Sequence, residues 1–379
     1  MTGAGASGHG SAKAGGKDAK SKEPRYSKFT QQEMWAARPI PTPFSVITAF
    51  MVIAVVFVPL GAACLAASRS TVEYSARYDD SCMPGDGNAA REAALMTLAG
   101  EGNQCDAVTF DITEKMEAPV YLYYELDNYH QNHRRYVTSR SDPQLRGGDV
   151  KSTLDACEPR RYRIGSAESE ANAVTPCGLI AWSLFNDTFS VFTDADRTQE
   201  IAVSADGIAW PTDVQNRFGG DVFPVNFNQD PPTRGGGTLD PAVALADQER
   251  LAVWMRVATL PRFRKLWGRI DQDIPAGTTL HLRIQNRYNT YRFDGKKAIV
   301  LATASWLGGK NDFLGVSLLV VGCCSLLFAV VYFAVAMVHP RKAGDLAYLS
   351  WNREREAAAR AHMGNPEAPL VGSASGTMH

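Results

Sequence analysis

The sequence lacks the short motifs by which many enzymes are recognised. It has no glycine-rich phosphate loop, because Gly308-Gly309-Lys310 has neither the upstream glycine nor the following Ser or Thr. A Gly-x-Ser-x-Gly nucleophile turn and the paired-cysteine spacing of a zinc site are also missing. We therefore expect no catalytic residue, no metal and no cofactor in this chain.

Charged residues are absent from two long stretches, residues 44–67 and 313–338. At about 1.5 Å per residue, helices of this length reach roughly 36 and 39 Å, enough to cross a bilayer core of about 30 Å. Buried core helices of such length usually keep one polar face, and these stretches have none. Both stretches therefore predict membrane spans. Because neither contains a charged side chain, a path for a polar substrate through this chain alone is not expected.

The first span follows 43 mostly polar residues and is too long for the apolar part of a signal peptide. It is therefore interpreted as a retained signal anchor. An alternative remains open, because small residues of the kind that a signal peptidase accepts lie near its end. These are Ala62, Ala63, Ala66 and Ala67. Cleavage there would leave a chain with a single span.

The charge balance differs between the three polar segments. Residues 1–43 carry seven Lys/Arg and three acids, residues 339–379 carry five and four, and residues 68–312 carry 27 and 33. Cytosolic flanks of membrane spans are usually the more basic ones, so both termini are predicted to be cytosolic. The whole chain is nearly neutral, with 39 basic and 40 acidic residues, and we expect no nucleic-acid partner.

Cysteines and a glycosylation signal independently point to an oxidising compartment for the middle segment. Of seven cysteines, three lie in the spans and four in residues 68–312, namely Cys82, Cys105, Cys157 and Cys177. An even number outside the bilayer is typical of disulfide-bonded lumenal domains. The acceptor Asn186, in Asn186-Asp187-Thr188, lies in the same segment. Residues 68–312 are therefore predicted to be lumenal or extracellular.

The pattern of the middle segment favours an antiparallel β domain, similar to a β-sandwich, with a few helices. Residues 120–126 form a β-branched and aromatic run, and Leu280, Leu282 and Ile284 alternate with polar residues. Asp294-Gly295 predicts a tight hairpin. Two helices are expected, one from Asp240-Pro241 to before Pro261 and a short one over residues 263–270. We expect the first and last strands each to lead into a span.

Two further patterns have functional as well as plain structural interpretations. His130 and His133 are three residues apart, but Arg134 and Arg135 would oppose a metal cation, so a hydrogen-bonded structural role is favoured. The second span carries a stripe of small residues at offsets of 7, 3 and 4, which would let another helix approach closely. The stripe consists of Gly315, Gly322, Ser325 and Ala329. We interpret it as a candidate partner-binding face, against the general abundance of small residues in membrane helices.

Several strings, taken together, resemble one family, the β-subunits of type IV P-type ATPases, which flip phospholipids. They run in order from YYELDNYHQNHRRYVTSRSDPQL (123–145) through CEP (157–159), PCGLIA (176–181), FNDT (185–188), GIAW (207–210), VWMR (253–256) and FRKL (263–266) to SWLGGKN (305–311). The resemblance covers roughly residues 26–340. FTQQE (29–33) and the last string are most similar to the plant members, called ALA-interacting subunits.

The resemblance implies an obligatory, non-catalytic partner of an ATP-driven flippase. Such subunits form a heterodimer with the catalytic chain and support lipid transport. They also help the catalytic chain to leave the endoplasmic reticulum for the Golgi, endosomes or plasma membrane. The resemblance also implies a Cys157–Cys177 disulfide. Some relatives carry four cysteines where this chain has only Cys82 and Cys105, so whether these two pair with each other is left open.

The predicted organisation has five parts. They are a cytosolic tail (1–43, with 1–24 disordered), a first span (44–67), an ectodomain (68–312), a second span (313–338) and a second cytosolic tail (339–379, with 364–379 disordered). Two rival functions share this organisation. A two-pass ligand-gated channel subunit would need spans that line a pore, which the apolar spans disfavour, and a membrane-tethered lumenal enzyme would need a site that the sequence lacks.

Overall fold

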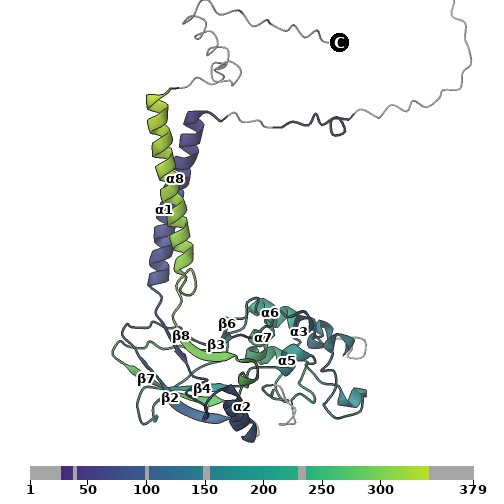
Figure 1. The fold of residues 1–379 in the computed structure, drawn as a ribbon. Helices are drawn as coiled ribbons and strands as arrows, with labels where there is room; N and C mark the ends of the chain where they lie inside the picture. The colour runs from purple at the N-terminus through teal and green to yellow at the C-terminus, as the bar shows by residue number, and fades with distance from the viewer. Residues whose placement is uncertain (1–26, 37–40, 99–101, 148–153, 229–235, 341–379) are drawn as a thin grey trace, which may run out of the picture. The chain divides into compact units, whose positions relative to one another are not determined.

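The computed structural model describes residues 27–36, 41–98, 102–147, 154–228 and 236–340. Two long helices, α1 (Pro43–Arg69) and α8 (Asp312–Val338), precede and follow, in the sequence, a domain built mainly of strands (Figure 1). Only 17% of the most apolar window of each helix is buried. The core helix of a soluble protein would be mostly covered, so this low coverage supports two membrane spans. The predicted disorder of 1–24 and 364–379 lies outside the described residues.

The chain divides into two compact units, which are described separately. The smaller unit joins Met1–Phe50 to Phe328–His379. Within it, the ring of Phe50 lies 5.7 Å from that of Phe328 and 5.9 Å from that of Tyr332 between centroids. The larger unit, Met51–Leu327, contains the rest of both long helices and the whole ectodomain.

The first sheet of the ectodomain connects directly to both long helices. Its strand order is β1-β8-β3-β6, all antiparallel, with bounds Glu73–Arg77 (β1), Lys296–Ala302 (β8), Val120–Asp127 (β3) and Phe263–Ile270 (β6). Strand β1 follows α1, strand β8 precedes α8, and Glu73 pairs with Ala302. The prediction that the first and last strands lead into the spans is confirmed.

The second sheet is also antiparallel, in the order β2-β7-β4-β5. Its strands are Asn103–Asp111 (β2), Thr279–Asn286 (β7), Thr188–Phe192 (β4) and Glu200–Ile201 (β5). Along β7 every second residue is buried, among them Leu280, Leu282 and Ile284, as the alternating pattern predicts. Both sheets contribute to one hydrophobic core, so the predicted two-sheet antiparallel fold is confirmed.

Helices of the ectodomain are short. They are α2 (Asn88–Thr97), α3 (Arg134–Val137), α4 (Asp142–Leu145), α5 (Leu179–Trp182), α6 (Pro211–Arg217) and α7 (Glu249–Met255), with 3-10 turns η1 (Leu154–Cys157), η2 (Glu170–Asn172), η3 (Leu245–Asp247) and η4 (Tyr291–Phe293). Indole Nε1 of Trp254 on α7 donates to the carbonyl oxygen of Ile180 on α5 over 2.7 Å. Trp254 is fully buried and thereby joins these helices to the core.

The short amphipathic helix predicted for residues 263–270 is wrong, because this segment is strand β6. Leu122 of β3 pairs with Gly268, but the next residue, Tyr123, pairs with Leu266, so Trp267 is an extra residue in the ladder. Such a bulge shifts the alternation of buried positions by one residue. The shift gave the apolar residues a spacing that resembles a helix.

Two other local predictions are also wrong. The helix expected from Asp240 is reduced to η3 and α7, because the Asp240 carboxylate accepts from the amide of Ala242 and the amide of Leu245 bonds to Val222. Asp294 makes no hairpin. It lies in the left-handed region (φ 55°) at the end of η4, and the strands on either side, β7 and β8, belong to different sheets.

Candidate interaction surfaces

The two long helices approach each other through glycines in the larger unit. A Cβ added to Gly315 would lie 2.7 Å from the backbone nitrogen of Leu65, and one added to Gly322 would lie 2.7 Å from Cγ2 of Val58. On α1, a Cβ at Gly61 would lie 2.8 Å from the backbone nitrogen of Leu319. The contact positions rise along α8 from 315 to 322 while they fall along α1 from 65 to 58, so the two helices are antiparallel. Close backbone approach through small residues is a common basis of helix association in membranes.

The candidate stripe of α8 is buried as a set, since Ser325 and Ala329 are also buried. Ser325 donates its hydroxyl to the carbonyl oxygen of Val321 in the preceding turn. Gly315 and Gly322 contact the chain's own first helix, so this contact alone accounts for two small residues of the stripe. That the stripe binds a helix of another protein stays a prediction.

A polar contact joins the two helices where they meet the ectodomain. The hydroxyl of Ser68, in the last turn of α1, donates to the carboxylate of Asp312 and accepts from the backbone amide of Asn311. Asp312 is the first residue of α8, where a carboxylate interacts favourably with the helix dipole. The end of α1 and the beginning of α8 are thus held together by side chains as well as by close packing.

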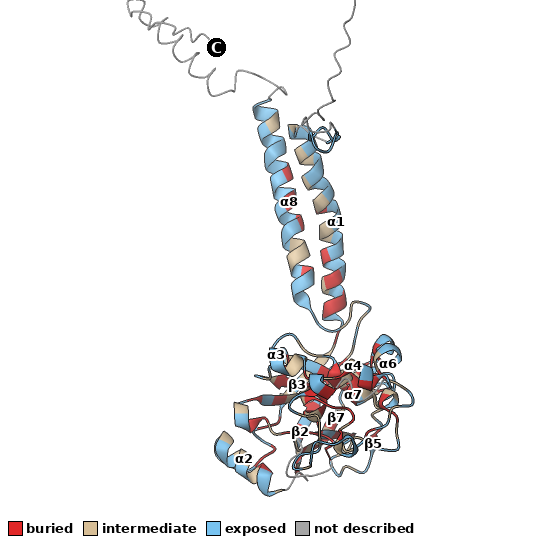
Figure 2. Ribbon diagram, turned by 90° about the vertical axis from the view of Figure 1, so that its right-hand side faces the viewer, coloured by how far each residue is buried: buried red, intermediate tan, exposed pale blue. Residues whose placement is uncertain are grey.

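Away from this contact, both helices present apolar side chains to their surroundings. Buried positions are few along α1 and α8 (Figure 2). The exposed apolar side chains include Val52, Val55 and Val56 of α1 and Val320, Leu327 and Phe328 of α8. Contiguous apolar surface of this extent has to be covered by lipid or by another membrane helix.

The centre of the ectodomain holds two buried charges in contact. Nζ of Lys297, on β8, donates to Oδ2 of Asp187 over 2.7 Å, and both side chains are 0% exposed. The Tyr78 hydroxyl and the backbone amides of Arg287 and Tyr288 also donate to the Asp187 carboxylate. Burial lowers the pKa of Lys297, an effect that Asp187 opposes. Burial, together with the charge of Asp187, raises the pKa of Tyr78 well above its usual value.

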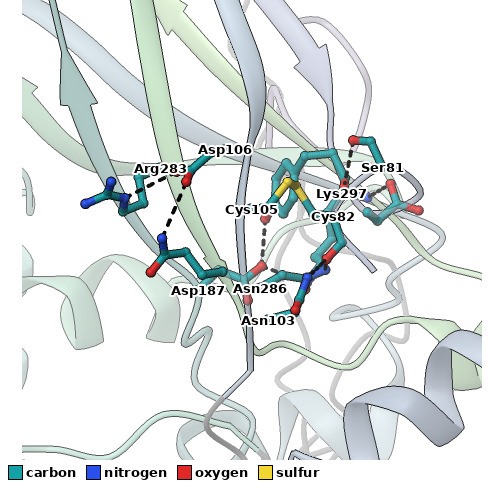
Figure 3. The surroundings of a disulfide bond; sticks show 12 residues. Ser81, Cys82, Asn103, Cys105, Asp106, Asp187, Arg283, Asn286 and Lys297 are labelled. Atoms are coloured by element: carbon teal, nitrogen blue, oxygen red, sulfur yellow. Dashed lines mark hydrogen bonds and ion pairs between the residues drawn. A yellow bond between two sulfur atoms is a disulfide. The ribbon is translucent and has the colours of Figure 1, made fainter. Parts of the chain in front are cut away.

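This polar centre continues to the first disulfide, Cys82–Cys105, which the structure contains (Figure 3). Nζ of Lys297 also donates to Oδ1 of Asn286, and Nδ2 of Asn286 donates to the carbonyl oxygen of Cys82. The open question about these two cysteines is therefore answered, since they pair with each other. The disulfide, the buried ion pair and strand β8 form one connected network.

The second disulfide, Cys157–Cys177, is also present, as the family resemblance implies. It packs with Leu154 and Ala173 in a small cluster separate from the main core. Gln144 of α4 accepts from the backbone amide of Cys177, and its own amide donates to the carbonyl oxygen of Val174. The bond thus holds a loop-rich part of the ectodomain that contains few strands.

The acceptor Asn186 of the glycosylation signal lies directly before strand β4. Asn186 is partly buried, Thr188 is exposed, and Asp187 between them is the buried carboxylate described above. The signal therefore occupies a fixed position in the fold, because its middle residue is held by four hydrogen bonds. Whether a glycan is attached to Asn186 stays a prediction.

His130 and His133 line one shallow surface pocket with Leu260 and Pro261. Among the described residues, no group of three or more His, Cys, Asp or Glu is arranged to hold a metal ion. The backbone amide of His133 donates to the carbonyl oxygen of His130, and that of Tyr129 to Pro261. The geometry observed for this pair is therefore that of a hydrogen-bonded loop.

Several large apolar side chains of the non-helical segments are exposed. Phe29 and Trp35, which precede α1, are 78% and 91% exposed, and Leu260 and Trp306 in the ectodomain are 68% and 74% exposed. Trp210 is 64% exposed, but the guanidinium of Arg256 lies 5.1 Å from its ring centroid. No pattern in the sequence marks these side chains individually, although Phe29, Trp210 and Trp306 lie within the strings that carry the family resemblance.

The fold and these surfaces define a class of protein. It is an antiparallel two-sheet domain with two disulfides, preceded and followed in the sequence by two apolar helices that pack against each other. The buried ion pair between Lys297 and Asp187 lies at the centre of this domain.

Comparisons with known proteins specify the class further. Residues 64–342 match the family described as the LEM3 (ligand-effect modulator 3) family / CDC50 family. ALA-interacting subunit 3 of Arabidopsis thaliana is 47% identical over 350 residues, covering 92% of this chain and 96% of the relative. Cell cycle control protein 50A of Bos taurus is 33% identical, covering 84% and 91%. The chain belongs to the CDC50/LEM3 family.

A yeast relative carries a more explicit name. The phospholipid-transporting ATPase accessory subunit CRF1 of Saccharomyces cerevisiae is 31% identical over 360 residues, which cover 88% of this chain and 90% of the relative. The family match includes all four ectodomain cysteines, the glycosylation signal and helix α8. The resemblance to this family, inferred from the sequence, is confirmed.

Proposed function

We propose that this chain is the non-catalytic β-subunit of a type IV P-type ATPase that flips phospholipids, with which it forms a heterodimer. The observation that carries the proposal is family membership over nearly the whole chain, together with relatives named as ATPase accessory and ALA-interacting subunits. A β-subunit needs no catalytic site of its own. It needs a stable ectodomain and membrane helices that a larger protein can contact.

The partner docks in the membrane on the exposed apolar faces of α1 and α8. The stripe formed by Gly315, Gly322, Ser325 and Ala329 contributes to docking through the helix pair, because α1 already lies against Gly315 and Gly322. A catalytic-subunit helix that reached these glycines would have to displace α1. Substitutions in the stripe therefore weaken the complex by separating or tilting the two helices that the partner recognises.

The ectodomain, residues 68–312, lies in the lumen or outside the cell, and both termini are cytosolic. The complex leaves the endoplasmic reticulum for the Golgi, endosomes or plasma membrane. This orientation predicts one N-linked glycan at Asn186. Glycosidase treatment should lower the apparent mass, and Asn186→Gln or Thr188→Ala should each abolish the shift, whereas Thr188→Ser, at an exposed position and with the signal kept, serves as the matched control. A glycan that persists in the first two variants would contradict the assignment.

The central experiment is co-expression with a type IV P-type ATPase from the same organism. The ATPase should leave the endoplasmic reticulum, and labelled phospholipid should enter cells, only when both chains are present. The purified chain alone should hydrolyse no ATP. Two controls separate this role from general effects: an ATPase with an inactivated catalytic aspartate, and a P-type ATPase that transports ions. The proposal fails if no type IV ATPase co-purifies with the chain or depends on it for exit or transport.

A further inference from the structure

The connection between strand β8 and helix α8 contains a tight turn with an exposed tryptophan. The amide of Ser305 donates to the carbonyl oxygen of Gly308 over 2.8 Å, and the amide of Gly308 donates back to Ser305 over 2.9 Å. Gly308 has φ +110°, a conformation that side chains disfavour. Trp306 and Leu307 therefore occupy the tip of a defined turn. The turn presents the indole of Trp306 outwards, 74% exposed.

This turn lies next to the beginning of a membrane span. Trp306 precedes Asp312, the first residue of α8, by six residues, so even a fully extended chain would separate them by only about 20 Å. The hydrogen-bonded turn shortens that separation. The headgroup layer adjoins the end of the apolar span, and the turn lies in the short segment that leaves this end.

The surroundings of the turn carry the side chains that such a layer favours. Phe313, in the first turn of α8, is 81% exposed, and Lys310 between the turn and the helix is exposed. Arg69 is exposed at the end of α1, which Ser68 joins to the beginning of α8. Lipid phosphates attract cations, and indole rings combine an apolar body with one N–H donor that headgroups satisfy.

The indoles of Trp306 and Trp210 differ in their contacts within the chain. Trp210 is similarly exposed but is stacked with Arg256. For Trp306, no ring or cation contact occurs within the described part of the chain. Indole rings are enriched at membrane interfaces, where the apolar ring and the single N–H donor both find partners.

We propose that the Ser305–Gly308 turn is seated in the phospholipid headgroup layer on the ectodomain side of the membrane, with the indole of Trp306 as its anchor. Leu307 and Phe313 extend the apolar contact towards the acyl chains, while Arg69 and Lys310 meet lipid phosphates. The turn thereby fixes the depth at which α8 enters the bilayer. This lipid contact goes beyond the β-subunit role and does not depend on it.

A photo-crosslinking experiment tests the contact directly. The full chain carries p-benzoylphenylalanine in place of Trp306 and is placed in nanodiscs of phosphatidylcholine and phosphatidylserine. Irradiation should yield adducts with the mass of a phospholipid at position 306. The control places the same probe at Met96, which is 67% exposed on α2. The neighbouring Leu95 packs with Tyr291, which lies just before the start of β8, whereas α8 follows the other end of that strand. This position should give no lipid adduct above background.

A second arm repeats the irradiation with the ATPase bound. Lipid adducts at 306 should persist, whereas replacement by an adduct with the ATPase polypeptide would show that the turn is a protein contact and would overturn the proposal. Equal lipid labelling at 306 and 96, or none at 306, would overturn it as well. A conservative variant, Trp306→Phe, guards against probe artefacts. It should remove the part of the tryptophan fluorescence that dibrominated phosphatidylcholine quenches, and loss of only iodide-quenched fluorescence would contradict the proposal.

Discussion

The helix pair and the ectodomain are both closely packed, but glycines form the contacts of the helix pair, whereas the ectodomain contains a buried pair of charged side chains. In the larger unit, α1 and α8 come closest at Gly61, Gly315 and Gly322, which have no side chains. The ectodomain instead encloses a full positive and a full negative charge, Lys297 and Asp187, at 0% exposure. In a bilayer there is little hydrophobic gain from helix association, so contact depends on how closely the backbones approach. In the ectodomain, ordinary apolar burial surrounds the charges and makes their mutual contact obligatory.

The difference teaches which changes each region tolerates. A buried ion pair contributes little compared with an apolar pair of the same shape, but removing one partner leaves an uncompensated charge. A glycine contact makes no directional bond, yet any added atom has to displace a neighbour. The ectodomain should therefore be most sensitive to losing an atom group, and the helix pair to gaining one.

The largest effect is expected for Lys297→Met. This change leaves the Asp187 carboxylate buried without its cation and should destabilise the ectodomain by about 3–5 kcal/mol. The full chain should then remain in the endoplasmic reticulum, which is measured by glycan processing and by thermal unfolding in mild detergent. Lys296→Met is the matched control, since Lys296 is the exposed neighbour on the same strand. Equal stability of the two variants would show that the ion pair is dispensable.

Combining Lys297→Met with Asp187→Asn sharpens this prediction. The double variant removes both charges and keeps the glycosylation signal, so it should be more stable than Lys297→Met alone. If the double variant is less stable than Lys297→Met, the loss of stability comes from lost hydrogen bonds to the Asp187 carboxylate and not from an unpaired charge.

The second effect concerns the disulfides, which crosslink only the ectodomain. Cys157→Ser opens a link between residues 20 apart in sequence and should cost about 3 kcal/mol in the chain-entropy description. Lower ectodomain stability and reduced exit from the endoplasmic reticulum are expected. Cys323→Ser, at an exposed free cysteine of α8, is the control and should change neither property. Normal traffic and partner binding of Cys157→Ser would contradict a supporting role for this bond.

The sequence predicted the two regions unequally well. Both spans, the two-sheet fold and strands β3 and β7 follow from local patterns, because absence of charge and alternation are visible within one segment. The ion pair between Asp187 and Lys297 was not predicted. Its members are 110 residues apart, and each resembles an ordinary surface charge until the fold brings them together.

Both spans carry a sequence signal for the helix pair. The stripe of α8 runs through residues 315, 322, 325 and 329, and buried small residues of α1 repeat the same offsets of 7, 3 and 4 at Ala54, Gly61, Cys64 and Ser68. Matching stripes would have predicted that the two spans of this chain pack together. For strand β6 the sequence signal is misleading, because the bulge at Trp267 gives the apolar residues a helical spacing although the segment is a strand.

The third effect distinguishes two glycines of the helix pair. Gly315→Ala places Cβ 2.7 Å from the backbone nitrogen of Leu65, whereas Gly322→Ala places Cβ 2.7 Å from a side-chain methyl of Val58 and 3.0 Å from the nearest backbone atom, so the backbone clash is smaller at Gly322. Overpacking costs about 1–3 kcal/mol, so Gly315→Ala should weaken the co-purified ATPase complex more than Gly322→Ala does. Cys323→Ala, on an exposed face, should leave recovery of the complex unchanged. The reverse order would show that a partner helix, and not α1, lies closest to Gly322.

The smallest effect is a pH dependence that belongs to the ectodomain alone. Lys265 is buried and has no carboxylate partner among the residues that the structure describes; its Nζ donates to the carbonyl oxygens of Val253, Trp254 and Arg256 at the end of α7. Burial, with a smaller contribution from Arg256, lowers the pKa of Lys265 from 10.5 to about 7. Between these two pKa values the unfolded chain binds more protons than the folded one, so stability should rise as pH rises from about 7 towards 10.

The measurement is the free energy of unfolding of wild type and Lys265→Met between pH 7.5 and 9.5, below the range where tyrosines ionise. Wild type should gain up to about 1 kcal/mol per pH unit relative to the variant. The variant is expected to be less stable at every pH, because three carbonyl oxygens lose their donor, so the slope and not the offset is diagnostic. Parallel curves would mean that the three carbonyl oxygens keep Lys265 protonated throughout this range. In that case backbone carbonyl dipoles would stabilise the buried cation without a carboxylate. This would be a third type of close contact in the protein, beside the glycine contacts and the ion pair.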